Sequence, residues 1–70
     1  MEERDIALLA RAGAVRSVAT SETPGKGWTL TVNGEPVRSA RQAPRMFKTL
    51  DAVASMLGRV GVSKFEVELR

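Results

Sequence analysis

Apolar residues recur at helical spacing in two stretches of the chain, and each stretch predicts a helix. Over residues 2–12, Ile6, Leu9 and Ala10 fall on one helical face, and Gly13 follows as a stop. Acidic residues open this segment and a basic residue closes it, which suits the helix dipole. We therefore expect a short amphipathic helix that ends before residue 13.

The second helical stretch carries one apolar stripe and clear end signals. Its apolar residues repeat every three or four positions, and they are Leu50, Val53, Ala54, Leu57 and Val60. Thr49 precedes the stripe as an N-cap, Asp51 lies in the first turn, and Gly61 ends the segment. This pattern predicts a helix over residues 50–60 with one buried face.

Alternation of apolar and polar residues predicts a hairpin in the middle of the chain. Trp28, Leu30 and Val32 alternate with threonines, and Asn33-Gly34 follows. This dipeptide favours a two-residue type I′ turn, because both of its residues tolerate positive φ. The resulting register sets Leu30 opposite Val37 on the core face.

The same register defines the solvent face of the hairpin and its place in the sheet. Thr29 lies opposite Arg38, so that Thr29, Thr31 and Arg38 share the solvent face. Pro36 cannot donate a ladder hydrogen bond, which predicts that the returning strand lies at a sheet edge.

The remaining segments complete an α+β fold. Residues 14–20 predict a strand whose faces the pattern leaves open, residues 24–27 a turn, and residues 65–69 a half-buried strand. The order α-β-β-β-α-β predicts a single small α+β domain over residues 1–70, with a mostly antiparallel four-stranded sheet and both helices on one face. A right-handed crossover gives the spatial strand order 3-2-1-4. The expected core consists of Trp28, Leu30, Val37, Leu50, Val53, Leu57, Val60, Phe65 and Val67.

The composition removes most routes to enzymatic chemistry. The chain has no Cys, no His and no Tyr, so its scattered serines lack a histidine base. The acidic clusters at residues 2–5 and 66–68 are explained by solvation and by the helix dipole. Gly25-Lys26-Gly27 lacks the glycine spacing of a phosphate loop and leads into a strand. We therefore expect no enzymatic activity, no cofactor and no metal site.

The length and the charge of the chain limit which partners are expected. A chain of 70 residues builds a small core that no disulfide can reinforce here, which favours a homodimer. No stretch approaches the roughly 20 apolar residues that span a membrane. The acidic N-terminus differs from a signal peptide, so we expect a cytoplasmic protein without a membrane partner. The formal net charge of +3 is compatible with a nucleic-acid partner.

An acid-free run over residues 38–48 holds the candidate binding residues. They are Arg38, Arg41, Gln42, Arg45 and Lys48. Arginine can hold phosphates or guanine edges, glutamine can bond to adenine, and a two-stranded ribbon can enter a major groove. The alternative is a solvated edge whose charges discourage aggregation. Because no acid balances the run, we favour nucleic-acid binding, with Thr29 and Thr31 flanking the basic residues. Trp28 points to the same face of the predicted strand as Leu30, which favours a core position for Trp28 over a base-stacking role.

The chain also resembles small accessory proteins encoded near partition, replication or mobilisation genes of bacterial plasmids and integrative elements. The resemblance covers most of residues 13–69 and is carried by Gly27-Trp28, Val32-Asn33-Gly34, Arg41, Pro44-Arg45, residues 47–52, Leu57, Gly61-Val62 and Phe65. The order of hairpin and helix is similar to the small β-sheet DNA-binding modules of tyrosine recombinases, although this chain adds a first helix and a final strand. The resemblance implies a DNA-associated role.

Two hypotheses about function follow. The first is a non-enzymatic DNA-associated accessory protein of a mobile genetic element, acting in plasmid maintenance or regulation. The alternative is a protein–protein adaptor or dimerisation module that pairs an exposed sheet edge with a strand of a partner, such as another protein of the same locus.

Overall fold

Six elements follow one another along the chain in the predicted order. The protein is represented by a computed structural model that describes residues 1–69. Its elements are α1 (Glu3–Arg11), β1 (Val18–Thr23), β2 (Gly27–Val32), β3 (Glu35–Pro36), α2 (Leu50–Arg59) and β4 (Glu66–Glu68). The α+β class is therefore confirmed.

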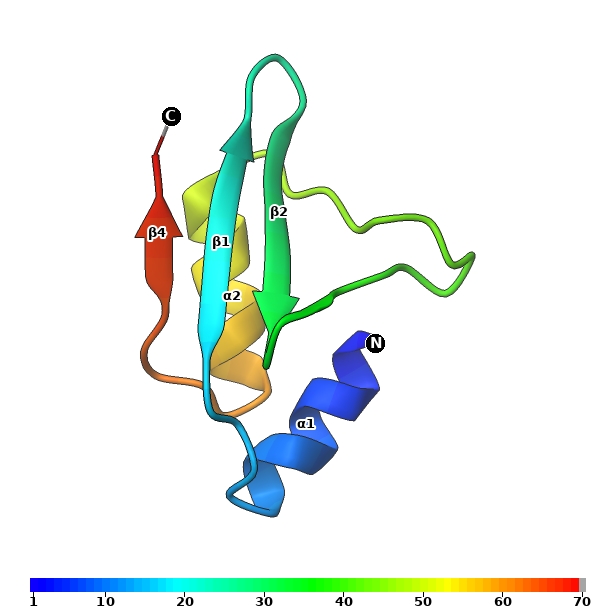
Figure 1. The fold of residues 1–70 in the computed structure, drawn as a ribbon, viewed down its shortest axis with the longest axis vertical. Helices are drawn as coiled ribbons and strands as arrows, with labels where there is room; N and C mark the ends of the chain where they lie inside the picture. The colour runs from blue at the N-terminus through cyan, green and yellow to red at the C-terminus, as the bar shows by residue number, and fades with distance from the viewer. Residues whose placement is uncertain (70) are drawn as a thin grey trace.

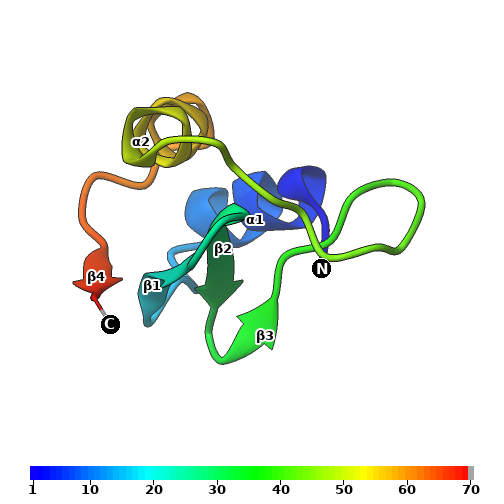
Figure 2. The ribbon, with the colours of Figure 1, turned by 90° about the horizontal axis from the view of Figure 1, so that it is seen from above.

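The four strands form one mixed sheet. Their spatial order is β3-β2-β1-β4, which confirms the predicted 3-2-1-4 arrangement (Figures 1 and 2). The β1–β2 and β2–β3 pairs are antiparallel, whereas β1 and β4 are parallel because the α2 crossover returns the chain to the same end of the sheet. Both helices lie on the same side of the sheet (Figure 2).

The predicted turn at Asn33-Gly34 is confirmed. Asn33 and Gly34 have φ angles of 53° and 81°, as a type I′ turn requires. The Val37 N–H donates to the Leu30 carbonyl at 2.9 Å, so the predicted pairing of these two residues is also correct.

The hairpin is shorter than predicted, and the pairing of Thr29 with Arg38 is wrong. Strand β3 ends at Pro36, and Arg38 pairs with Pro44 in place of Thr29. A later segment occupies the position beside the start of β2, where the backbones of Trp28 and Phe47 exchange hydrogen bonds of 2.7 and 2.9 Å. This approach requires a glycine before Trp28, because a Cβ atom at Gly27 would overlap the carbonyl oxygen of Phe47.

Strand β1 begins later than the predicted residue 14, and the side chain of Asn33 explains why. Its Oδ1 accepts hydrogen bonds from the N–H groups of Arg16 and Ser17 at 2.7 and 3.1 Å. Its Nδ2 donates to the carbonyl of Ala14 at 3.0 Å. The backbone from residue 14 to residue 17 is therefore bonded to the β2–β3 turn, and the pairing of β1 with β2 starts at Val18.

The core lies between the helices and the sheet. Its buried apolar residues are Ile6, Val18, Leu30, Val32, Val37, Phe47, Val53, Met56 and Leu57. Leu30, Val37, Val53 and Leu57 were predicted, whereas the predicted core residues Trp28, Leu50, Val60 and Phe65 are half-buried against this cluster. The prediction for Val67 is wrong, because 40% of this residue is exposed on the edge strand β4.

The ends of α2 confirm the sequence signals. The Thr49 hydroxyl accepts a hydrogen bond from the Ala52 N–H at 3.1 Å, as an N-cap does. At the other end Gly61 is left-handed, with φ of 91°, and Val62 N–H donates back to the Leu57 carbonyl. None of the helices that the structure describes has the length and apolar character to cross a membrane.

Candidate nucleic-acid interface

Residues 37–45 form a second, smaller hairpin, which we call the basic arm. Arg45 N–H donates to the Val37 carbonyl at 3.1 Å, and Ser39 N–H donates to the Ala43 carbonyl at 2.8 Å. The turn is closed by a 2.9 Å bond from Gln42 N–H to the Ser39 carbonyl, and Gln42 has a left-handed φ of 65°. This is the pattern of a three-residue hairpin loop that ends in a left-handed residue. The arm projects beyond β3, away from the rest of the sheet (Figure 1).

The tip of the basic arm presents a single free cation. Residues 40–43 are all exposed, and Arg41 stands between small and neutral neighbours, Ala40 and Gln42. Within residues 1–69, the Arg41 side chain takes part in no hydrogen bond or ion pair. Its guanidinium is therefore available to an external anion.

Arg45, in contrast, is bound within the protein. Its Nη1 lies 2.9 Å from Oε1 of Glu3, and its guanidinium lies 5.1 Å from the centre of the Phe47 ring. Glu3 is also 3.6 Å from Nη2 of Arg59 on α2. The expectation that no acid balances the basic run is thus wrong, because the balancing acid comes from α1, more than 40 positions away in sequence.

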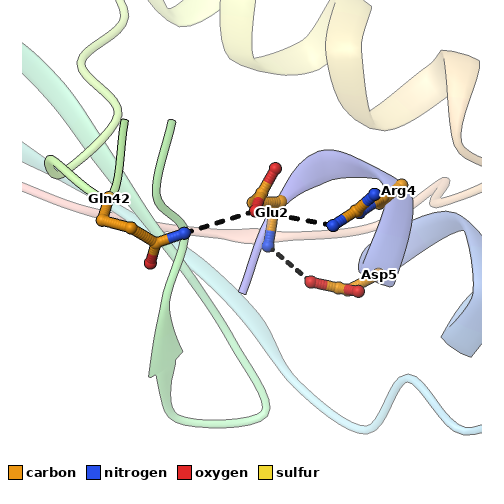
Figure 3. A network of polar contacts seen from close by, with 4 residues as sticks. All are labelled: Glu2, Arg4, Asp5 and Gln42. Carbon is orange, nitrogen blue, oxygen red and sulfur yellow. Dashed lines mark hydrogen bonds and ion pairs between the residues drawn. The ribbon is translucent and has the colours of Figure 1, made fainter. Parts of the chain in front are cut away.

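The N-terminal residues also hold the arm, at Arg38 near its base and at Gln42 in its loop. Arg38 N–H donates to the Met1 carbonyl at 2.7 Å, and Nη1 of Arg38 donates to the Gln42 carbonyl at 3.2 Å. Nε2 of Gln42 donates to Oε2 of Glu2 at 3.4 Å. This carboxylate also faces Arg4 at 3.9 Å, as Figure 3 shows. Arg38 and Gln42 therefore position the arm, and the sequence pattern by itself gave no sign of these contacts.

The start of α1 supports this anchor. The Asp5 carboxylate accepts a hydrogen bond from the Glu2 N–H at 2.8 Å, which fixes the residue that faces Gln42 (Figure 3). The acids at the N-terminus, interpreted from sequence as solvated charge, thus connect helix α1 to the basic arm.

Lys48 lies apart from the arm, at the other end of the sheet. It lines a shallow hollow of about 490 Å³ with Lys26, Trp28, Glu22 and neighbouring residues of the β1–β2 turn. Sequence reasoning placed Lys26 only in a turn. Its proximity to Lys48 follows from the pairing of Phe47 with Trp28, which no local pattern signals. Lys26 and Lys48 form a second basic feature, distinct from the tip of the arm.

The two predicted threonines lie on the open face of the sheet. The Oγ1 atoms of Thr29 and Thr31 donate to the carbonyls of Ser21 and Ala19 at 3.4 and 3.3 Å. Because Arg38 leaves the sheet after β3, neither threonine is paired with a basic residue. The structure thus brings Arg38, Arg41, Gln42 and Arg45 together in the arm and leaves Lys48, Thr29 and Thr31 elsewhere.

No protein-family model matches the chain, and the searches of curated proteins and of solved structures also returned no match. In the described part of the chain, no three acidic, cysteine or histidine side chains lie close enough together to hold a metal ion.

Proposed function

We propose that the protein is a non-enzymatic DNA-binding accessory protein whose basic arm contacts the duplex through Arg41. The observation that carries the proposal is the free guanidinium at the tip of an anchored, projecting hairpin. A fixed arm loses little conformational freedom on binding, because its base is already bonded to the N-terminal residues. A guanidinium offers a planar fork of donors that fits phosphate oxygens or base edges.

The shape of the tip supports contact with a groove or with the phosphates along it. The residues that flank Arg41 and Gln42 are alanines, so the tip is narrow and its arginine is the longest side chain there. Arg38 and Arg45 lie toward the base of the arm and add positive charge, although the Glu3 carboxylate offsets part of it. Lys48 and Lys26 provide a second contact region for the backbone of a longer duplex. The link to a mobile genetic element rests on the sequence resemblance alone.

The proposal is tested by fluorescence anisotropy with a labelled duplex at low salt. We expect the wild-type chain to bind duplex DNA, and we expect Arg41→Ala to weaken binding several-fold without changing the thermal midpoint. Arg16→Ala is the matched control, because it removes the same charge from an exposed residue in the α1–β1 connection. Weakening by Arg41→Ala alone supports the proposal.

Two results would contradict it. One is the absence of duplex binding by the wild-type chain at low salt. The other is an equal loss of affinity for Arg41→Ala and Arg16→Ala, which would mean that net charge and not the arm determines binding.

A further inference from the structure

The two edges of the sheet differ in their availability to another strand. At the β3 edge, Pro36 has no N–H, its carbonyl accepts a hydrogen bond from the Met1 ammonium at 3.2 Å, and Arg38 N–H is bonded to Met1. At the opposite edge, β4 pairs with β1 on one side, and no described strand pairs with its other side. The open edge is therefore β4.

The side chains of β4 divide by chemistry between the two faces of the sheet. Val67 is the register partner of Thr20, a fully buried residue, so Val67 points to the side that carries the helices. Glu66 and Glu68 point to the open face, and both are exposed. On the helix side, Val67 and Leu69 are 40% and 76% exposed, which leaves an apolar row beyond the core.

This charge pattern opposes pairing of β4 with a second copy of itself. A two-fold axis perpendicular to the sheet keeps equivalent faces together, so every antiparallel register centred on a residue of β4 sets a glutamate of one copy opposite a glutamate of the other. Like charges that face each other directly across a strand pair are destabilising. Full overlap of β4 with its own copy is therefore disfavoured as the interface of the homodimer expected from the short chain.

One flank of α2 carries small, exposed residues. Arg59 lies on the flank of α2 that faces α1, because its side chain pairs with Glu3. Helical periodicity places Ala54 and Gly58 on a different flank of α2, away from α1. Both residues are exposed, and a Cβ atom at Gly58 would meet nothing within 4 Å. In Figure 1, α1 and β4 lie on opposite sides of α2.

We propose that β4 accepts an extended strand from a partner protein that carries basic side chains on one face and apolar side chains on the other. The basic face would meet Glu66 and Glu68 across the new strand pair. The apolar face would cover Val67 and Leu69. Backbone hydrogen bonds to the free side of β4 would supply the pairing. This site lies on the opposite edge of the sheet from the basic arm and does not depend on DNA binding.

The test is an NMR titration with two short blocked peptides, one alternating Lys with Val and the other alternating Glu with Val. We expect the Lys peptide to shift the backbone amides of residues 65–69 and to bind roughly ten-fold more tightly than the Glu peptide. Glu66→Lys should reduce the affinity for the Lys peptide. The matched charge reversal Glu35→Lys, on the closed edge, should leave that affinity unchanged.

Three results would overturn the proposal. The first is equal affinity for the two peptides. The second is a set of shifted amides that clusters at the acidic start of α1 and omits β4. The third is a shift of the β4 amides with protein concentration in the absence of peptide, which would assign the edge to a second copy of this chain.

Discussion

Two turns of the molecule contain a non-glycine residue with left-handed backbone, yet the two side chains bond very differently. Asn33, in the β2–β3 turn, has φ of 53° and makes three side-chain hydrogen bonds to the backbone of residues 14–17. Gln42, at the tip of the basic arm, has φ of 65° and makes one long side-chain bond to Glu2. The first turn is therefore bonded to the rest of the fold at three points, whereas the second is held by one side-chain bond and leaves the neighbouring Arg41 side chain without an internal partner among the described residues.

The largest effect should come from the core that both turns share. Leu57 is 1% exposed and belongs to the same buried cluster as Leu30 and Val37. These two residues lie on either side of the β2–β3 turn in the sequence. We expect Leu57→Ala to cost about 2–5 kcal/mol of unfolding free energy, the usual range for a buried leucine. Denaturant unfolding followed by Trp28 fluorescence measures it, and an unchanged midpoint would contradict the packing of α2 described above.

Asn33→Gly is the sharpest test of the first turn. Glycine adopts the left-handed backbone freely, so this variant keeps the turn geometry and removes only the three side-chain bonds. We expect a loss of about 2–3 kcal/mol, at roughly 1 kcal/mol for each bond. A neutral result in thermal or urea unfolding would show that asparagine is present only for its backbone conformation.

Arg45→Ala should have an intermediate effect, because it acts at the base of the arm. The variant removes the 2.9 Å pair with Glu3 and the stacking on Phe47, at a side chain that is about one-third exposed. We expect a loss of about 1 kcal/mol, since partly exposed ion pairs and cation–π contacts contribute modestly. Glu3→Gln serves as the partner variant in a double-mutant cycle. Strict additivity of the two changes would contradict the contact.

Gln42→Gly should have the smallest effect on stability, and one of opposite sign to that of Asn33→Gly. Relief of the left-handed backbone outweighs the loss of one 3.4 Å hydrogen bond, so we expect a gain of about 0.5 kcal/mol. Differential scanning calorimetry can resolve the sign. A clear loss of stability would show that the side chain of Gln42 anchors the arm more firmly than its single bond indicates.

The same comparison explains what the sequence could predict. Asn33-Gly34 is a local signal, and the alternation of Leu30 with threonines sets the register of the hairpin, so the order of elements, the strand order and the paired core residues were predictable. The arm was not predictable, because its shape depends on contacts between residues 38–45 and residues 1–3. A count of the charges along residues 38–48 does not include Glu3, because only the folded chain brings Glu3 to Arg45.

The exposure of β4 was hidden for a similar reason. Phe65, Val67 and Leu69 alternate as a half-buried strand should, but the residues of α2 pack in one core with those of β1 and β2, and Val67 and Leu69 at the edge stay exposed. Alternation reports which residues share a face, and it does not report how far the neighbouring layer extends.

The Arg41 side chain at the tip of the basic arm has no internal partner among the described residues, and we propose that it contacts phosphate. The most direct measurement is the slope of log affinity against log salt concentration for duplex DNA, taken for the wild-type chain and for Arg41→Ala. This slope is negative, and each phosphate contact on duplex DNA makes it steeper by about 0.9, so we expect the slope for Arg41→Ala to be less steep by about 0.9 at unchanged thermal stability. An identical slope for the two proteins would contradict the account.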